Sequence, residues 1–342
     1  MKLSSVPHTL EFKYPFKIAL YSRNTTAVVI TEISCEGIIG YGEASMPPYL
    51  GESAETVLRF LSKAKKILSE YKFPLDLEEL LNRIDLIEEK NTAAKASIDI
   101  ALHDLKGKLE GKPCYEFWNL KGYEAPNTSI TIGMDEPEVI LEKLKDADAF
   151  KILKVKLGGV NDVDIVHTIR SYTDKAISVD VNQGWTNKEE ALERIQWLKD
   201  KNVLFVEQPL KKEDLAGAVW LKERSPLPII ADESIQRYAD LERIKDCFHG
   251  INVKLMKCSG LNEAHKIILQ AKKYDLKVLI GCMSETSCAI SAAAQLSSLA
   301  DWVDLDGPLL IKKDLFKGLS YVEGKIVLSG KPGIGVERAE DL

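Results

Sequence analysis

The chain lacks several features that would place it in a specialised class of protein. None of its 342 residues lie in an apolar run near the roughly 18 residues that a membrane-spanning helix needs. Its first segment, MKLSSVPHTLEFKYPFK, has no continuous apolar core of the kind that secretory signal peptides carry. Low-complexity tracts and long linkers are also missing. We therefore expect a cytoplasmic protein with no membrane partner.

Paired cysteines and a basic surface are missing as well. Six cysteines are scattered without any CxxC spacing, which is typical of reduced thiols rather than of disulfides. The formal net charge is −6 and no stretch is rich in lysine or arginine, so we expect no nucleic-acid partner. Hydrophobic residues make up 45% of the chain, which is enough for the substantial core of a globular protein.

Short apolar strands alternate with helical segments from about residue 127 onward. The strands are apolar throughout, as in a parallel sheet that is covered on both faces. We expect residues 121–311 to form an α/β barrel. The helices predicted there span 163–172, 187–201, 215–225, 240–246, 262–274 and 287–299, with Asn187 and Asn262 as helix caps.

The first 120 residues follow a different pattern. β-branched residues such as Thr26–Ile33 predict strands, and apolar residues at helical spacing predict helices at 54–71 and 92–109. The charged, glycine-rich segment 312–342 is strand-like, and we assign it to the same α+β domain. Three glycines are expected at turns between the first strands: Gly37, Gly40 and Gly42.

Charged residues close successive apolar stretches of the predicted barrel. The sequence reads ILKVK, ISVDVN, VLFVEQP, IIADES and INVKLMK, and consecutive motifs are about one strand-plus-helix unit apart. The carboxyl ends of barrel strands meet at one end of the barrel, where such folds carry their chemistry. The residues expected at that end are Lys154, Lys156, Asp180, Glu207, Asp232 and Lys254.

Three of these residues are carboxylates and predict a metal site. Oxygen ligands without histidine or cysteine favour one hard divalent cation, Mg²⁺ first and Mn²⁺ second. The five histidines do not accompany Asp180, Glu207 or Asp232, which disfavours zinc. Each carboxylate alone could equally be a loop or cap residue, but three in succession at strand ends favour a metal.

The lysines predict proton transfer. Side chains alternate along a strand, so Lys154 and Lys156 point the same way, and their repulsion is expected to lower the pKa of the more buried one. A lysine with a pKa near neutrality can act as a general base. Lys254, on the sixth barrel strand, would face Lys156 across the metal, whereas Lys257 is interpreted as a loop residue. The alternative is a strand end with two solvated lysines.

Two aspartates follow the last predicted barrel strand. Asp304 and Asp306 share a face by alternation and could hold a substrate ammonium, or they could belong to a solvated turn. Gly158 and Gly159 follow the lysine pair without GxGxxG spacing, which gives little support to nucleotide binding.

In this order the motifs resemble those of the muconate-lactonising subgroup of the enolase superfamily, across essentially the whole chain. GYGEAS resembles the end of that family's capping sheet, and ASIDIALHDLKGKLEGKP resembles its capping helix. The resemblance implies a (β/α)7β modified TIM barrel with an α+β capping domain built from the N-terminal segment and the C-terminal tail. IGCMSE followed by DLDGP resembles the dipeptide epimerases, of which Ala-Glu epimerases are the best known.

This resemblance implies an isomerase. Such an enzyme is an Mg²⁺-dependent dipeptide epimerase, which inverts the α-carbon of the C-terminal residue by two-base 1,1-proton transfer through an enediolate. Lys156 and Lys254 would transfer the protons, and Asp180, Glu207 and Asp232 would bind the metal. The substrate-binding residues implied are Thr131, Lys154, Cys282 and Met283, with Asp304 and Asp306 on the α-ammonium of the dipeptide.

One departure from the family concerns substrate choice. Epimerases that accept a C-terminal glutamate carry an arginine in the N-terminal loop after FK, where this chain has Tyr21, with Arg23 two residues later. If Tyr21 occupies that site, apolar or small residues are favoured over glutamate. Loops near residues 17–26 and 45–52 would close over the substrate and exclude water.

Several alternatives stay open. Cycloisomerisation, o-succinylbenzoate synthesis and N-acylamino acid racemisation in the same subgroup also need the metal and the lysines, but none obviously needs two carboxylates aimed at an ammonium. A non-catalytic, metal-dependent dipeptide-binding protein would not need a base on each face. A barrel scaffold with incidental charges is a further alternative. A homo-oligomer is compatible with the sequence.

Overall fold

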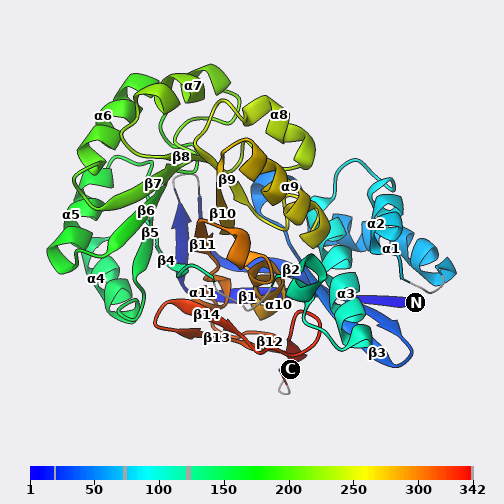
Figure 1. Ribbon diagram of the computed structural model, residues 1–342. Helices are drawn as coiled ribbons and strands as arrows, with labels where there is room; N and C mark the ends of the chain where they lie inside the picture. Colours follow the sequence, from blue (N-terminus) through cyan, green and yellow to red (C-terminus); the bar gives the residue numbers. More distant parts are fainter. Residues whose placement is uncertain (19–20, 72–74, 121–124, 340–342) are drawn as a thin grey trace.

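A computed structural model describes residues 1–18, 21–71, 75–120 and 125–339 of the chain. Within these ranges, eight parallel strands form one sheet in the order of the chain, and three antiparallel strands form a second sheet (Figure 1). A bridge between Thr128 and Val303 joins the first and last parallel strands, which closes the sheet into a barrel. The predicted barrel with a separate α+β capping unit is confirmed.

The barrel strands are short and almost entirely buried, as their apolar sequences predict. Helices cover their outer face as a ring, seen on the left of Figure 1. The strands are β4 (Ser129–Ile132), β5 (Ile152–Lys156), β6 (Ala176–Asp180), β7 (Val203–Glu207), β8 (Ile229–Ala231), β9 (Gly250–Val253), β10 (Lys277–Gly281) and β11 (Trp302–Asp304). The helices are α4 (Pro137–Asp146), α5 (Asp162–Tyr172), α6 (Lys188–Leu198), α7 (Leu215–Arg224), α8 (Leu241–Ile244), α9 (Leu261–Lys273), α10 (Ser287–Ala294) and α11 (Gly307–Leu310).

The second sheet and three helices form a unit that we call the cap. Helix α3 lies across the sheet beside the barrel, and α1 and α2 lie farther out (Figure 1). The elements of the cap are β1 (Lys2–Ile18), β2 (Tyr21–Cys35), β3 (Ile38–Ser45), α1 (Ala54–Glu70), α2 (Leu77–Asp85) and α3 (Thr92–Glu110).

The C-terminal residues contact both the cap and the barrel. They form two short antiparallel pairs, β12 (Phe316–Lys317) with β15 (Glu337–Arg338) and β13 (Leu319–Val322) with β14 (Lys325–Leu328). The backbone N–H of Ile334 donates to Asp104 Oδ1 in α3 at 2.9 Å, and the Phe316 ring lies 5.3 Å from that of Tyr41. The tail thus contacts α3 of the cap and also α10 of the barrel, where Ser291 Oγ donates to Ile334 O at 2.6 Å.

Two of the glycines expected at turns lie inside a strand instead. Gly37 does occupy the β2–β3 turn with φ of +82°, but Gly40 and Gly42 belong to β3. A Cβ on Gly40 would lie 2.1 Å from Ala101 O, and one on Gly42 would lie 1.9 Å from Ser97 O. Because Gly40 and Gly42 have no side chains, the backbone of α3 can pack closely against β3.

Several helix boundaries differ from the prediction. The helix expected over 287–299 ends at Ala294, and the one expected over 240–246 is only the four-residue α8. Helices α2 and α4 were not predicted, although each carries apolar residues at helical spacing; both are only nine or ten residues long.

The two predicted helix caps have different outcomes. Asn187 caps α6 by accepting a hydrogen bond from Glu190 N at 2.9 Å, as expected. Asn262 is not a cap, because α9 already begins at Leu261 and Asp99 of the cap accepts hydrogen bonds from its first N–H groups.

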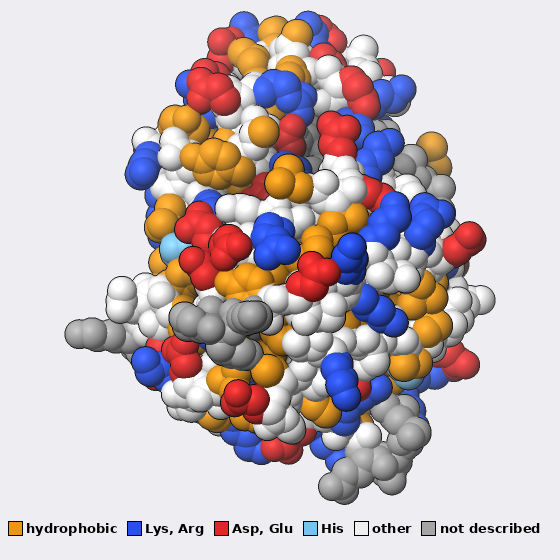
Figure 2. Space-filling model, turned by 90° about the vertical axis from the view of Figure 1, so that its right-hand side faces the viewer, with side chains coloured by type: hydrophobic (Ala, Val, Ile, Leu, Met, Phe, Trp, Pro, Cys, Tyr) orange, Lys and Arg blue, Asp and Glu red, His pale blue; other side chains and the backbone are white. Residues whose placement is uncertain are grey.

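The surface carries charges of both signs. Acidic and basic side chains are interspersed with apolar ones on the face that Figure 2 shows. None of the helices in the described part of the chain is long and apolar enough to cross a membrane.

Candidate functional site

The carboxyl ends of six barrel strands bring the predicted charged residues together. Lys156, Asp180, Glu207 and Asp304 are the last residues of their strands, while Asp232 and Lys254 immediately follow β8 and β9. All six are buried. The regular interval in the sequence thus corresponds to one polar cluster at one end of the barrel.

Three carboxylates in this cluster could hold a metal ion. Asp180, Glu207 and Asp232 each offer one oxygen, and these oxygens all lie within 4.8 Å of one another. Burial raises the pKa of Glu207 to about 7, with the charge of Asp180 adding to the effect. At Asp180 burial acts in the same direction, but Lys154 and Lys156 outweigh it and lower the pKa. An all-oxygen, buried and anionic set of this kind fits a hard divalent cation.

Lys154 lies at the centre of the carboxylates. Its Nζ is 3.0 Å from Asp180 Oδ2, 2.9 Å from Glu207 Oε2 and 2.8 Å from Asp304 Oδ2. Burial alone would lower the pKa of Lys154, but these charges raise it well above its ordinary value. The expected lowering by repulsion between lysines is therefore wrong for Lys154, because three anions surround it.

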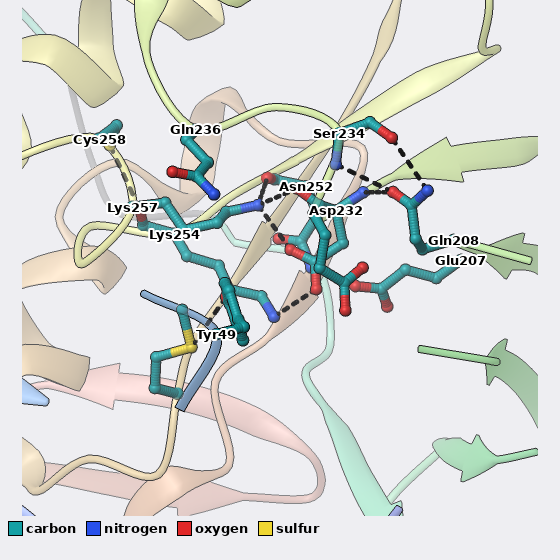
Figure 3. Close-up of polar contacts among 12 residues, drawn as sticks. Tyr49, Glu207, Gln208, Asp232, Ser234, Gln236, Asn252, Lys254, Lys257 and Cys258 are labelled. Carbon is teal, nitrogen blue, oxygen red and sulfur yellow. Dashed lines mark hydrogen bonds and ion pairs between the residues drawn. The ribbon is translucent and has the colours of Figure 1, made fainter. Parts of the chain in front are cut away.

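The two lysines expected to transfer protons hold different carboxylates. Lys156 Nζ donates to Asp180 Oδ2 at 2.7 Å and to Asn182 Oδ1 at 3.1 Å. Lys254 Nζ donates to Asp232 Oδ2 at 2.7 Å (Figure 3). Burial opposes the charged form of Lys254, but Asp232 raises its pKa well above the ordinary value. The two ammonium groups are thus bonded to different members of the carboxylate set.

Lys257 is more than a loop residue. It does lie in the turn after β9, but its side chain is only 1% exposed and points inward. Its Nζ donates to Asp232 Oδ1 at 2.5 Å, to Asp232 O at 2.6 Å and to Asn252 O at 2.9 Å (Figure 3). All three ammonium protons are used. Lys257 and Lys254 therefore hold different oxygens of the Asp232 carboxylate.

Two neutral residues that we did not predict support the carboxylates. Asn252 Nδ2 donates to Glu207 Oε1 at 2.6 Å. Gln208 Oε1 accepts from Asp232 N at 2.9 Å and from Ser234 N at 3.1 Å, so one amide joins the ends of β7 and β8 (Figure 3). Both residues occur inside the EQP and INVKLMK motifs, and this adjacency was the available signal.

A cavity lies between this cluster and the cap. The barrel contributes residues expected to touch substrate: Thr131, Lys154, Lys156, Lys254, Cys282, Met283, Asp304 and Asp306. The cap contributes Phe16, Ile18, Arg23, Pro47 and Tyr49. Asp232 also lines the cavity. The space is thus bounded by cations and carboxylates on the barrel side and by largely apolar groups on the cap side.

Asp304 and Asp306 both line the cavity and have different partners. Asp304 Oδ1 accepts from Ser129 Oγ at 2.6 Å, and its Oδ2 is paired with Lys154. Asp306 Oδ2 accepts from Thr131 N at 2.7 Å. Burial raises the pKa of Asp306 to about 6, with the charge of Asp304 adding to the effect. A cationic group placed between these carboxylates would be favoured.

Arg23 reaches the cavity from the β1–β2 hairpin. Its guanidinium donates to Ser284 Oγ and to Thr26 Oγ1, both at 3.2 Å. It also lies over the rings of Phe12 and Phe16, at 5.5 and 5.6 Å from their centroids. The side chain of Tyr21, the other residue considered for this position, lies outside the described residues.

Both parts of the chain match models of known families. Residues 2–118 match the mandelate racemase / muconate lactonizing enzyme N-terminal domain, and residues 139–342 match the enolase C-terminal domain-like family. The chain belongs to the enolase superfamily.

Named members of the enolase superfamily resemble the chain over nearly its full length. It is 51% identical to the L-Ala-D/L-Glu epimerase of Bacteroides thetaiotaomicron, over 98% of this chain and 88% of the relative. The substrate-liganded L-Ala-D/L-Glu epimerase of Bacillus subtilis superposes with a TM-score of 0.92 at 30% identity, over 98% of this chain and 99% of that one. The dipeptide epimerase of Cytophaga hutchinsonii, solved with Mg and D-Ala-L-Val, gives 0.92 at 30% identity, over 100% and 97%.

Two buried carboxylates lie where the cap of this superfamily member meets the barrel. Glu43 of β3 accepts a hydrogen bond from Thr286 N at 3.0 Å, at the start of α10. Glu285 accepts from Met283 N at 3.0 Å. Burial, together with the charge of Glu43, raises the pKa of Glu285 to about 8. The folded protein therefore retains a proton on Glu285 at pH values at which the unfolded chain has lost it.

Because the pKa of Glu285 is raised, its contribution to stability should fall as pH rises. The folded state retains a proton that the unfolded chain loses near pH 4 to 5, so the free energy of unfolding should fall by about 1 kcal/mol per pH unit between pH 5 and pH 8. Glu285→Gln should remove this component. Urea unfolding across the pH range measures it as the difference between wild type and variant. Glu242→Gln, on the exposed surface of α8, is the control; a constant difference for Glu285→Gln would contradict the account.

Proposed function

We propose that this protein is an Mg²⁺-dependent dipeptide epimerase, which inverts the α-carbon of the C-terminal residue by two-base 1,1-proton transfer through an enediolate. The observation that carries the proposal is the placement of two lysines. Lys156 bonds Asp180, Lys254 bonds Asp232, and both line one cavity with Asp304 and Asp306. The epimerase names of its relatives support this class of isomerase.

The proposal assigns one Mg²⁺ to Asp180, Glu207 and Asp232, with Mn²⁺ able to substitute. Their oxygens are close enough to share an ion, and the Mg that accompanies the dipeptide in the Cytophaga hutchinsonii enzyme supports the choice. When bound, the ion would act as a Lewis acid that stabilises negative charge developing on the substrate carboxylate. Sites of this superfamily generally combine such ions with a lysine or histidine base.

The lysines do the proton transfer in this proposal. One of them, as the neutral amine, removes the α-proton, and the ammonium of the other returns a proton to the opposite face. Asp232 stabilises the ammonium form of Lys254, which suits proton donation. Two positioned groups avoid the need for a solvent proton, and each typically contributes about 100- to 10,000-fold to the rate.

Other residues would bind and enclose the dipeptide. Asp304 and Asp306 are assigned to its α-ammonium, because both carboxylates line the cavity and a paired anionic site favours a cation. Thr131, Lys154, Cys282 and Met283 are assigned to further contacts. Residues 1–120 with 312–342 would act as the capping domain over a catalytic barrel of residues 121–311, excluding water from the site.

The second residue of the dipeptide is a separate part of the proposal. If Tyr21 takes the specificity position, apolar or small residues are favoured over glutamate. Arg23 gives a competing candidate, because its guanidinium lines the cavity and this group can bind a carboxylate through two parallel hydrogen bonds. The two candidates predict opposite behaviour toward dipeptides that end in glutamate.

Replacing Arg23 with methionine separates them. Methionine keeps an apolar stem against Phe12 and Phe16 but removes the charge. If Arg23 binds glutamate, kcat/KM for L-Ala-L-Glu should fall about 10- to 100-fold, as expected for one charged hydrogen-bond partner, while L-Ala-L-Leu turnover is retained. Arg83→Met on the surface of α2 is the matched control. Equal effects on both dipeptides would instead favour the apolar-preference candidate.

A substrate panel tests the reaction itself. Dipeptides and N-acyl amino acids are incubated with the Mg²⁺-loaded protein in D2O and read by mass spectrometry. The proposal predicts the gain of one deuterium at the C-terminal residue of particular dipeptides. Gain on N-acyl amino acids alone would indicate the racemase alternative, and no gain on either class would favour cycloisomerisation or o-succinylbenzoate synthesis. Saturable dipeptide binding without any gain would indicate a binding protein.

A further inference from the structure

We infer that Asp99, a carboxylate of the cap, is a positioning residue for the barrel loop that carries Lys254 and Lys257. Asp99 lies in α3 and is 1% exposed. Its Oδ1 accepts from Leu261 N at 2.6 Å and its Oδ2 accepts from Asn262 N at 3.2 Å. The effect on catalysis rests on the proposed function, whereas the effect on the loop does not.

The residue before helix α9 cannot provide a side-chain acceptor for the first N–H groups of that helix. The first N–H groups of a helix lack partners within it, and the residue before α9 is Gly260, which has no side chain. Gly260 adopts φ of +114°, and a Cβ there would lie 2.4 Å from both Cβ and Cγ of Asp99. By contrast, α7 is capped by its own Asp214, which accepts from Gly217 N at 2.8 Å. The first N–H groups of α9 therefore obtain their acceptor from Asp99, which belongs to the N-terminal unit.

Backbone hydrogen bonds within the loop of residues 254–260 connect Gly260, at the start of α9, with Lys254 in the site. Lys257 N and Cys258 N both donate to Lys254 O, at 3.0 and 3.2 Å, and Gly260 N donates to Leu255 O at 3.0 Å. These hydrogen bonds link the end of the loop, where α9 begins, to the backbone at Lys254 and Leu255. Figure 3 shows Lys254 and Lys257 converging from this loop on Asp232. A shift at Gly260 would thus move both lysines relative to Asp232.

Asp99 is held in place by His103, which in turn packs against aromatic rings. His103, one turn along α3, has its Nδ1 3.2 Å from Asp99 Oδ1. The His103 ring stacks on Trp118 with centroids 5.6 Å apart, and Trp118 in turn contacts His265 of α9 at 5.3 Å. Elsewhere on the same loop, Ser45 N of the cap donates to Met256 Sδ at 3.3 Å. The cap therefore forms hydrogen bonds with this loop and the start of α9 from two separate elements, α3 and β3.

The other proton-transfer lysine has a different support. Lys156 is the last residue of β5 and is itself paired with Asp180 of β6, whereas Lys254 lies one residue beyond the end of β9. Loosening Asp99 should therefore disturb the Lys254 side of the substrate and spare the Lys156 side. A general loss of stability would not discriminate between the two faces.

The test uses Asp99→Asn, with Asp214→Asn as the matched control for loss of a helix-capping carboxylate. Asparagine keeps one acceptor oxygen and replaces the other with an NH2 group, so it can reproduce only one of the two carboxylate oxygens that accept from Leu261 N and Asn262 N. Hydrogen exchange of the loop amides, followed by mass spectrometry, should speed up about 10-fold over residues 254–260 in Asp99→Asn only. Unchanged exchange in this loop would overturn the inference.

The catalytic readout is solvent deuterium uptake by each diastereomer of the preferred dipeptide. Asp99→Asn should slow uptake on one face by at least about 10-fold, since small misplacements of a catalytic group are costly, and leave the other face nearly unchanged. Equal slowing of both faces would overturn the positioning role. Gly260→Ala, which disturbs the same contact from the barrel side, should reproduce the face-selective loss if Asp99→Asn fails to fold. Wild-type protein that exchanges neither face would refute the proposed function, and amide exchange would still decide the inference.

Discussion

Lys254→Ala is expected to abolish epimerisation while hydrogen exchange survives on one face of the substrate. Inversion needs a proton donor on one side and a base on the other, so losing one lysine stops the product from forming. Lys156 bonds Asp180 rather than Asp232 and should still remove and return a proton on its own side. The rate of epimerisation should fall by about 100- to 10,000-fold or more, the usual contribution of a positioned acid or base.

The variant should remain folded, because Asp232 keeps a cationic partner. Lys257 is 2.5 Å from Asp232 Oδ1 and is unaffected by the change. The reciprocal variant Lys156→Ala is the matched control, and the two variants should exchange opposite diastereomers of one dipeptide in D2O. Chiral chromatography and mass spectrometry read both properties. Full epimerisation by Lys254→Ala, or loss of exchange for the same diastereomer in both variants, would contradict the two-base scheme.

Asp180→Asn is expected to weaken Mg²⁺ binding by at least about 100-fold. Removing even an outer-sphere partner of a metal ligand typically costs 10- to 100-fold, and Asp180 would be a direct ligand. The change also removes the carboxylate charge that pairs with Lys156, while Lys154 keeps Glu207 and Asp304. The positive charge that then stays unpaired beside the site would oppose a cation further.

Isothermal titration of metal-stripped protein with Mg²⁺ measures this effect without any substrate. Wild type should show saturable binding of one ion. Asp314→Asn serves as the control, because Asp314 is a carboxylate that bonds Ser287 at the start of α10, away from the three proposed ligands. Wild-type affinity in Asp180→Asn would remove Asp180 from the metal site and with it the proposed ligand set.

The polar cluster was predictable because barrel periodicity is local. A strand-plus-helix unit recurs at a nearly constant length, so a charged residue that closes each strand must reach the same end of the barrel. Lys156, Asp180 and Glu207 follow this rule directly. The alternation of side chains along a strand, which is also local, predicts that Lys154 and Lys156 share a face. No knowledge of distant contacts is needed for these inferences.

Features that depend on distant contacts escaped prediction. Asn262 has the residue type of a helix cap, but Asp99 of α3 takes that role from far away in the sequence. Gly40 and Gly42 look like turn residues, yet they serve the approach of α3. Lys257 is interpreted only as a loop residue, and the sequence does not predict that the turn after β9 directs its side chain onto Asp232. In each case tertiary packing overrides a local preference.

Proton exchange coupled to inversion is the central claim, and one reaction tests it most directly. Mg²⁺-loaded wild-type protein is incubated with L-Ala-L-Glu and with L-Ala-L-Leu in D2O, and the α-hydrogen of the second residue is followed by proton NMR. The account predicts that this signal disappears for at least one dipeptide while the signals of its L,D diastereomer appear. Retention of the α-hydrogen in both dipeptides, with no second diastereomer, would contradict it.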